Sequence, residues 1–155
     1  MGSDELHNTE EMERRFEAFL KGKRLRKTQE RFAILRKCLG YTGHFEADGL
    51  HGDLESDGYH VSRATVYNTL ELLTQCGILT RLLFDPHQAR YERADRNHCH
   101  LVCTQCGRIR EIDDKEVTER LSNMRLSTFT PQTMSICIYG ICAACQRRNR
   151  RKTKK

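Results

Sequence analysis

The sequence predicts an α+β fold in two parts: an N-terminal winged helix-turn-helix domain of the DNA-binding kind, and a small C-terminal α/β domain with a four-cysteine zinc site. Three observations lead to this prediction. Apolar residues recur at helical spacing up to Gly77, a β-hairpin pattern follows, and two Cys-x2-Cys pairs lie beyond the hairpin.

The first two predicted helices are separated by a basic segment. Thr9 can cap the first helix, which Gly22 ends, and Thr28 opens the second, which Gly40 ends. Each helix has its apolar residues on one face: Met12, Phe16, Phe19 and Leu20 in the first, and Phe32, Ile34, Leu35 and Leu39 in the second. Between them stand five cations in seven residues, Lys21, Lys23, Arg24, Arg26 and Lys27.

Two further helices precede the hairpin. The third carries Ala47, Leu50 and Leu54, although Gly49 and Gly52 weaken it by about 1 kcal/mol each relative to Ala. For the fourth, Ser62 is a good N-cap, Gly77 supplies the stop, and the buried stripe is expected to be Val66, Leu70 and Leu73.

The chain after Gly77 changes to a strand period. Residues 78–84 and 89–92 read as two strands joined by the turn 85–88. Beyond it we expect strands at 101–103, 109–112 and 133–139, with a helix at about 114–124. We therefore place the winged-helix domain at 1–94, a hinge at 95–97, the metal-binding domain at 98–146 and a basic, disordered tail at 147–155.

The charge is concentrated at one end. The net charge is +6, but seven cations lie in the last nine residues, so the rest of the chain carries −1. Affinity for a polyanion must therefore come from local clusters and from the tail. Because no apolar run approaches the roughly 18 residues of a membrane helix, we expect a soluble, cytoplasmic protein.

The cysteine pairs predict one structural Zn²⁺ site, with Cys103, Cys106, Cys142 and Cys145 as ligands. Four thiolates leave no open position for a substrate or water, so this site is not a reaction centre. The alternative is two disulfides, which a reducing compartment disfavours. We expect Cys38, Cys76 and Cys137 to fill core space, and Cys99 stays open as an oxidisable thiol.

The fourth helix is the candidate DNA-reading element. If its apolar stripe faces the core, Arg63, Tyr67, Asn68 and Glu71 lie on the opposite surface. An exposed tyrosine can meet a thymine methyl group, and Arg63 suits a phosphate or a guanine. The alternative is an ordinary amphipathic helix with a solvated face.

A second metal site is predicted from harder ligands. His98 and His100 fall on one face of an extended segment, with Cys99 on the other. Together with His44, Glu92 and Glu111 they form a set that suits Fe²⁺ or Mn²⁺ and spans both halves of the chain. The alternative for each residue by itself is a solvated side chain.

These pieces resemble the ferric uptake regulator (Fur) family of bacterial metal-responsive repressors. The resemblance runs from about Leu20 to Cys145, and its motifs are residues 64–67 (ATVY), 97–107 (NHCHLVCTQCG) and 139–145 (YGICAAC). The combination of a wing, H-x-H-L-x-C-x-x-C-G and a distant C-x-x-C is specific.

The resemblance implies a homodimer joined through the C-terminal domains, and a regulatory metal whose binding closes the dimer onto an A·T-rich inverted repeat. It also implies structural zinc on the four cysteines, Fe²⁺ as the regulatory metal (or Mn²⁺ or Zn²⁺), no membrane and no small-molecule substrate. The residues matched to the regulatory metal are His44, Glu92, His98, His100 and Glu111. Those assigned to DNA are Arg26, Ser62, Arg63, Thr65, Tyr67 and Asn68.

Departures from the family pattern leave alternatives open. A further site that some members carry is expected to be absent, because Asn97, Cys99 and Met134 stand where its ligands would be. Carboxylates at Glu92 and Glu111 resemble the iron branch, whereas the peroxide-sensing branch tends to have Asp there. A peroxide or redox sensor, acting through the His/Glu site or Cys99, is one alternative. Because zinc sensors of the family usually recruit a sulfur ligand, Cys99 leaves zinc sensing as another alternative. A mononuclear metallohydrolase is the remote alternative, since the sequence offers no obvious general base beside an open metal position.

Overall fold

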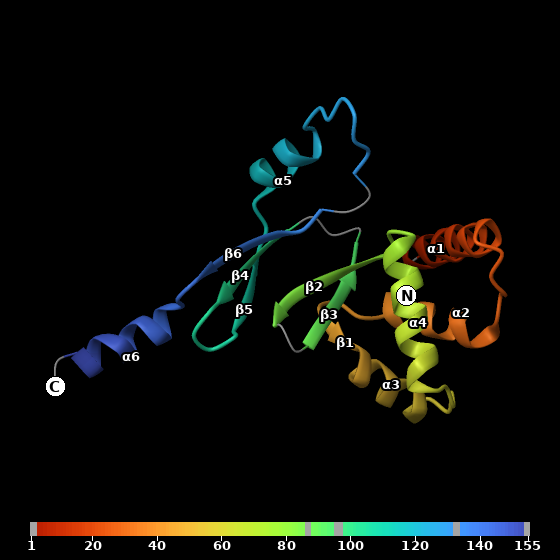
Figure 1. Cartoon of the computed structure of the whole chain (residues 1–155), viewed down its shortest axis with the longest axis horizontal. Helices are drawn as coiled ribbons and strands as arrows, with labels where there is room; N and C mark the ends of the chain where they lie inside the picture. The colour runs from red at the N-terminus through yellow and green to blue at the C-terminus, as the bar shows by residue number, and fades with distance from the viewer. Residues whose placement is uncertain (1–2, 86–87, 95–97, 132–133, 154–155) are drawn as a thin grey trace. The chain divides into compact units, whose positions relative to one another are not determined.

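The computed structural model describes residues 3–85, 88–94, 98–131 and 134–153 (Figure 1). Two compact units make up the chain, residues 1–95 and 96–155, and each is described by itself. The predicted hinge at 95–97 and the middle of the predicted turn, 86–87, lie outside the described residues. Within the described residues, none of the helices combines the length and apolar character that crossing a membrane requires.

Unit 1 begins with four helices that the sequence anticipates: α1 (Ser3–Gly22), α2 (Gln29–Leu39), α3 (Ala47–Ser56) and α4 (Arg63–Gln75). Two of the predicted N-caps are present. The hydroxyl of Thr28 accepts from the backbone N–H of Arg31 at 3.4 Å, and that of Ser62 accepts from the N–H of Thr65 at 3.1 Å. Past α4, Gly77 has φ 71°, the left-handed conformation that lets a glycine end a helix sharply. α1 starts before the predicted Thr9.

A three-stranded antiparallel sheet completes unit 1. Its strands are β1 (Phe45–Glu46), β2 (Leu79–Asp85) and β3 (Gln88–Arg93), in the order β1-β3-β2. β2 and β3 are the predicted hairpin, so helices followed by a hairpin form the winged helix-turn-helix. The two-residue β1 was not predicted, because a strand this short has no alternation to detect.

The apolar core lies in unit 1. Phe16, Ile34, Leu35, Leu50, Leu70 and Leu73 are fully buried, and the cluster extends over all four helices and the sheet. The predicted stripes of α2 and α4 therefore do face the core. The thiols of Cys38 and Cys76 fill space there, as expected, and burial raises the pKa of both. The same expectation was wrong for Cys137, which is only half-buried.

Unit 2 is a second three-stranded sheet with two helices. Its elements are β4 (Cys99–Cys103), β5 (Ile109–Ile112), α5 (Lys115–Ser122), β6 (Ile136–Gly140) and α6 (Ala143–Thr153), with strand order β5-β4-β6. β4 pairs antiparallel with β5 and parallel with β6. A parallel neighbour requires a long crossover, which the chain between β5 and β6 provides, including α5.

Two predictions for unit 2 need correction. The last strand begins at Ile136, not Thr133, which lies outside the described residues. The predicted disordered tail instead contains the greater part of α6, which is helical to Thr153. Ala, Gln, Arg and Lys are strong helix formers, and the helix is held at its start by the second cysteine pair, so the run of like charge does not prevent it.

Candidate metal centres and nucleic-acid interface

The four predicted zinc ligands come together at the end of the sheet in unit 2. Parallel pairing sets Cys103 opposite Gly140, so the end of β4 and the segment after β6 emerge side by side. The sulfurs of Cys103, Cys106, Cys142 and Cys145 all lie within 4.8 Å of one another. All eight cysteines are free of disulfides, so the disulfide alternative is wrong.

The turn between the first two cysteines is built for this site. The backbone N–H of Gly107 donates to the carbonyl of Cys103 at 2.9 Å, and the N–H of Cys103 donates to the carbonyl of Arg108 at 2.9 Å. Gly107 has φ 69°, which a side chain would strain, so glycine is needed to reverse the chain directly after the ligand pair.

The geometry and charge of the thiol cluster fit zinc. Zinc–sulfur bonds of about 2.3 Å in a tetrahedron require sulfurs about 3.8 Å apart, and Cys106 and Cys142 have their sulfurs 3.8 Å apart. The N–H of Cys142 donates to the Cys103 sulfur and lowers the pKa of Cys103 to about 6. Burial and the neighbouring sulfurs raise the pKa of Cys145 to about 12, since adjacent thiolates repel without a cation among them.

His44 and Glu92 form one half of the predicted regulatory site, within unit 1. The antiparallel register pairs Phe45 with Tyr91 and Glu46 with Arg90, which places His44 opposite Glu92. Their side chains meet at 3.3 Å between Nε2 and Oε2, and both are largely buried. The unpredicted strand β1 is therefore what positions this pair.

His98 and His100 form another pair, within unit 2. Their rings lie on the same face, with centroids 4.4 Å apart, as the period of an extended segment predicts. Cys99 is buried on the other face of β4. Glu111 is the direct neighbour of His100 across β4 and β5, but it is exposed and is not a member of either group of converging ligand atoms among the described residues.

The outer face of α4 presents the predicted DNA residues. Tyr67 is 48% exposed, and Arg63, Asn68 and Glu71 are exposed beside it. Arg63 forms an ion pair at 2.8 Å with Asp48 of α3, which holds its guanidinium at the start of α4.

The remaining candidate DNA-binding residues line one groove of about 570 Å³ in unit 1. Arg26, Ser62 and Thr65 all line it, although they come from the segment before α2 and from the start of α4. Arg24 of the basic cluster lines it too, as does Arg31, which was not singled out from the sequence. For Arg31 the available signal was its place three residues after the N-cap Thr28, one turn from the basic cluster.

Known proteins similar to this chain agree with these features. The family model described as the ferric uptake regulator family matches residues 22–139. The peroxide-responsive repressor PerR of Staphylococcus aureus is 32% identical over 124 residues, covering 79% of this chain and 83% of that protein.

Solved structures agree as well. The ferric uptake regulator of Pseudomonas aeruginosa with manganese has a TM-score of 0.63 and 26% identity, covering 80% of this chain and 96% of that one. That of Francisella tularensis with iron has a TM-score of 0.56 and 27% identity, covering 79% and 95%. With its winged helix, thiol cluster and histidine pair, the chain belongs to the ferric uptake regulator family and is a metal-responsive transcriptional repressor.

Proposed function

We propose that this chain is an Fe²⁺-dependent dimeric repressor, in which His44, Glu92, His98 and His100 hold the regulatory ion and Glu111 supports His100. The observation that carries the proposal is the division of these ligands. Each unit orders two of them, His44 with Glu92 at 3.3 Å and His98 with His100 on one strand face. Since two ligands hold a metal weakly and four hold it well, binding the ion favours one arrangement of the DNA-binding unit.

The ligand chemistry favours iron over zinc. Imidazoles with a carboxylate suit Fe²⁺ and Mn²⁺, and a zinc sensor is expected to recruit a sulfur. Cys99 is the nearest candidate, but it is buried on the strand face opposite the two histidines. Related regulators have been solved with manganese and with iron.

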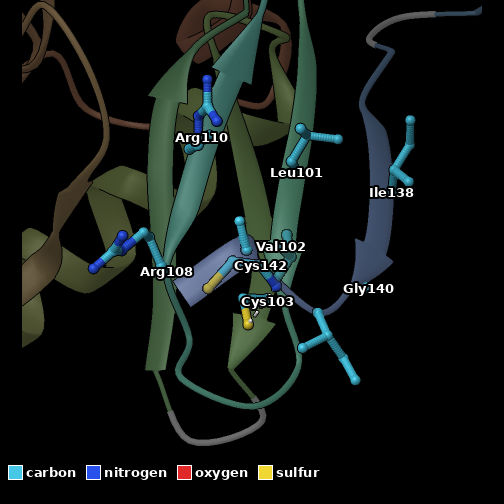
Figure 2. A pocket seen from close by; sticks show the side chains of 10 residues that line it. Leu101, Val102, Cys103, Arg108, Arg110, Ile138, Gly140 and Cys142 are labelled. Carbon is cyan, nitrogen blue, oxygen red and sulfur yellow. Dashed lines mark hydrogen bonds between the residues drawn. The ribbon is translucent and has the colours of Figure 1, made fainter. Parts of the chain in front are cut away.

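The second copy is proposed to cover unit 2. Ile138, Tyr139 and Ile141 are each about half exposed, and Ile138 and Ile141 line an apolar cavity of about 270 Å³. Cys103 and Cys142 line the same cavity (Figure 2). Exposed apolar groups gathered in this way mark an interaction surface, and a closed dimer satisfies it on both copies.

A two-fold dimer presents two copies of α4, so the proposed operator is an inverted repeat, rich in A·T. In each half-site Tyr67 contacts a base edge and Arg63 a phosphate or a guanine, while Arg26, Ser62 and Thr65, which share one groove, meet the adjacent backbone and minor groove. The basic segment before α2 supplies charge for these contacts.

Replacing Tyr67 by alanine is expected to weaken operator binding by about 1–3 kcal/mol and to leave binding to random duplex nearly unchanged, as for a base contact. Fluorescence anisotropy with both duplexes measures this, using an operator selected from a random library with metal-loaded protein. Glu71→Ala, on the same exposed face one turn later, is the matched control. An equal loss on both duplexes would make Tyr67 a backbone contact or a packing residue.

Peroxide sensing is the second candidate, favoured by the 32% identity to a peroxide-responsive repressor. The two functions separate when Fe²⁺-loaded and Mn²⁺-loaded proteins are treated with hydrogen peroxide on the operator. An Fe²⁺ sensor keeps its DNA in both cases. Release of DNA that requires bound iron, with oxidation of His98 or His100 in the mass spectrum, would instead establish the second function.

A further inference from the structure

The C-terminal end of the chain is strongly and uniformly basic. Residues 120–155 contain nine lysines and arginines and no aspartate or glutamate, whereas the remaining residues carry a net charge of −3. In the part of the chain that the structure describes, no carboxylate forms an ion pair with an arginine of α6. No carboxylate of the described residues therefore neutralises the arginines of α6.

α6 is hydrogen-bonded to the turn at residues 103–107, called here the zinc turn, and is therefore not a loose extension. The side-chain amides of Gln105 and Asn149 donate to each other's oxygens, both at 3.0 Å. Within α6, the guanidinium of Arg148 donates to the sulfur of Cys145 at 3.4 Å, and at its start the amide of Gln146 donates to the carbonyl of Ile141 at 2.8 Å. The Gln105–Asn149 pair therefore joins α6 to the turn that carries Cys103 and Cys106, while the other two bonds hold the start of the helix beside Cys142 and Cys145.

The contacts between α6 and the zinc turn determine which face of α6 points to solvent. Cys145 and Asn149 are four residues apart, so both point towards the zinc turn. At 100° per residue, Arg147, Arg150 and Arg151 lie on the opposite side of the helix, spaced as i, i+3 and i+4, and all three are exposed. A short helix thus presents a row of three guanidinium groups at fixed spacing, directed away from its anchor.

We propose that this row, the α6 arginine face, is a second DNA-binding surface that contacts the phosphate backbone without reading bases. The proposal rests on the proposed function in one respect, because it takes duplex DNA as the polyanion that this face binds. Guanidinium groups bind phosphate oxygens bidentately, and a docked helix loses less conformational entropy on binding than a disordered tail does. Because residues 1–119 carry a net charge of −3, the basic C-terminal end to which this face belongs supplies a large share of the long-range attraction to DNA.

The test compares two triple variants that remove the same charge from unit 2. Arg147→Gln, Arg150→Gln and Arg151→Gln together neutralise the α6 arginine face. Lys115→Gln, Arg120→Gln and Arg125→Gln together neutralise three exposed cations on and after α5. Zinc content and circular dichroism verify that both are folded. The slope of log K against log salt is then measured on random duplex from about 50 to 200 mM salt.

We expect the α6 triple variant to have a salt slope shallower by about 3 if one helix of the dimer reaches DNA, and by about 5 if both do, at about 0.9 per phosphate contact. The α5 triple variant should change the slope by less than about 1, and the operator-to-random affinity ratio should hold or rise in the α6 variant. Gln105→Ala, which keeps every charge but releases the docking, should give an intermediate slope and lower helicity.

Equal slopes for the two triple variants would overturn the inference. So would unchanged DNA binding by the α6 variant together with lost binding to vesicles of phosphatidylserine and phosphatidylcholine, which would assign the face to an anionic membrane. The Tyr67→Ala measurement tests the proposed function independently of this inference. Operator recognition can persist even if the α6 arginine face does not bind DNA.

Discussion

Replacing Cys103 by serine is expected to release the one structural zinc of each chain, unfold unit 2 and abolish the dimer. The buried apolar side chains cluster in unit 1, while in the described part of unit 2 the buried residues are mainly Cys99, Val102, Cys103 and Cys145. Such a unit has little hydrophobic stabilisation, and zinc binding to thiolates contributes on the order of 10 kcal/mol to folding. Loss of the zinc is therefore expected to unfold unit 2 and not merely to weaken it.

Gel filtration combined with zinc analysis measures both consequences. Cys137→Ser is the matched control, because Cys137 is a half-buried cysteine of β6 outside the thiol cluster, and this variant should keep its zinc and its dimer. A Cys103→Ser protein that remains a stable, zinc-free dimer would remove the structural role from the site.

Replacing His98 or His100 by alanine is expected to leave the structural zinc in place and to abolish the stimulation of DNA binding by Fe²⁺. The lost imidazole belongs to the ligands of the switch, and without it the metal no longer distinguishes the DNA-competent arrangement from the others. DNA binding of the variants with metal should fall to the level of the metal-free parent protein.

The neighbouring residue offers a control for this result. Cys99 lies between the two histidines in the sequence but on the opposite face of the strand. The Cys99→Ala variant should therefore respond to Fe²⁺ like the parent. Loss of the response in Cys99→Ala would point to a sulfur ligand and hence to a zinc sensor. A normal response in both histidine variants would place the regulatory site elsewhere.

The sequence predicts unit 1 well because its signals are local. Ser62 caps α4 and Gly77 stops it, and between them the apolar stripe fixes which side of the helix faces outward. The exposure of Tyr67 therefore follows from the sequence alone. The pairing of His98 with His100 is equally local, since it needs only an extended backbone.

Other features depend on contacts between distant residues and escape such reasoning. β1 has two residues, and it exists because β3 pairs with it, yet that pairing is what brings His44 to Glu92. The charge of residues 147–155 predicts disorder, but α6 runs to Thr153, and the reciprocal bonds that hold it, between Gln105 and Asn149, connect residues 44 positions apart. The sequence showed the cations of α6 without showing what orders them.

We propose that the regulatory metal controls DNA binding through ligands that the two units each supply. An anaerobic titration of the zinc-loaded protein with Fe²⁺ in the presence of labelled operator, with bound iron and bound DNA followed together, tests this. We expect operator affinity to rise at least tenfold, about 1.4 kcal/mol of coupling, and to saturate at one iron per chain. Operator binding that is equally tight with and without bound Fe²⁺ and Mn²⁺ would show that the metal does not control DNA binding.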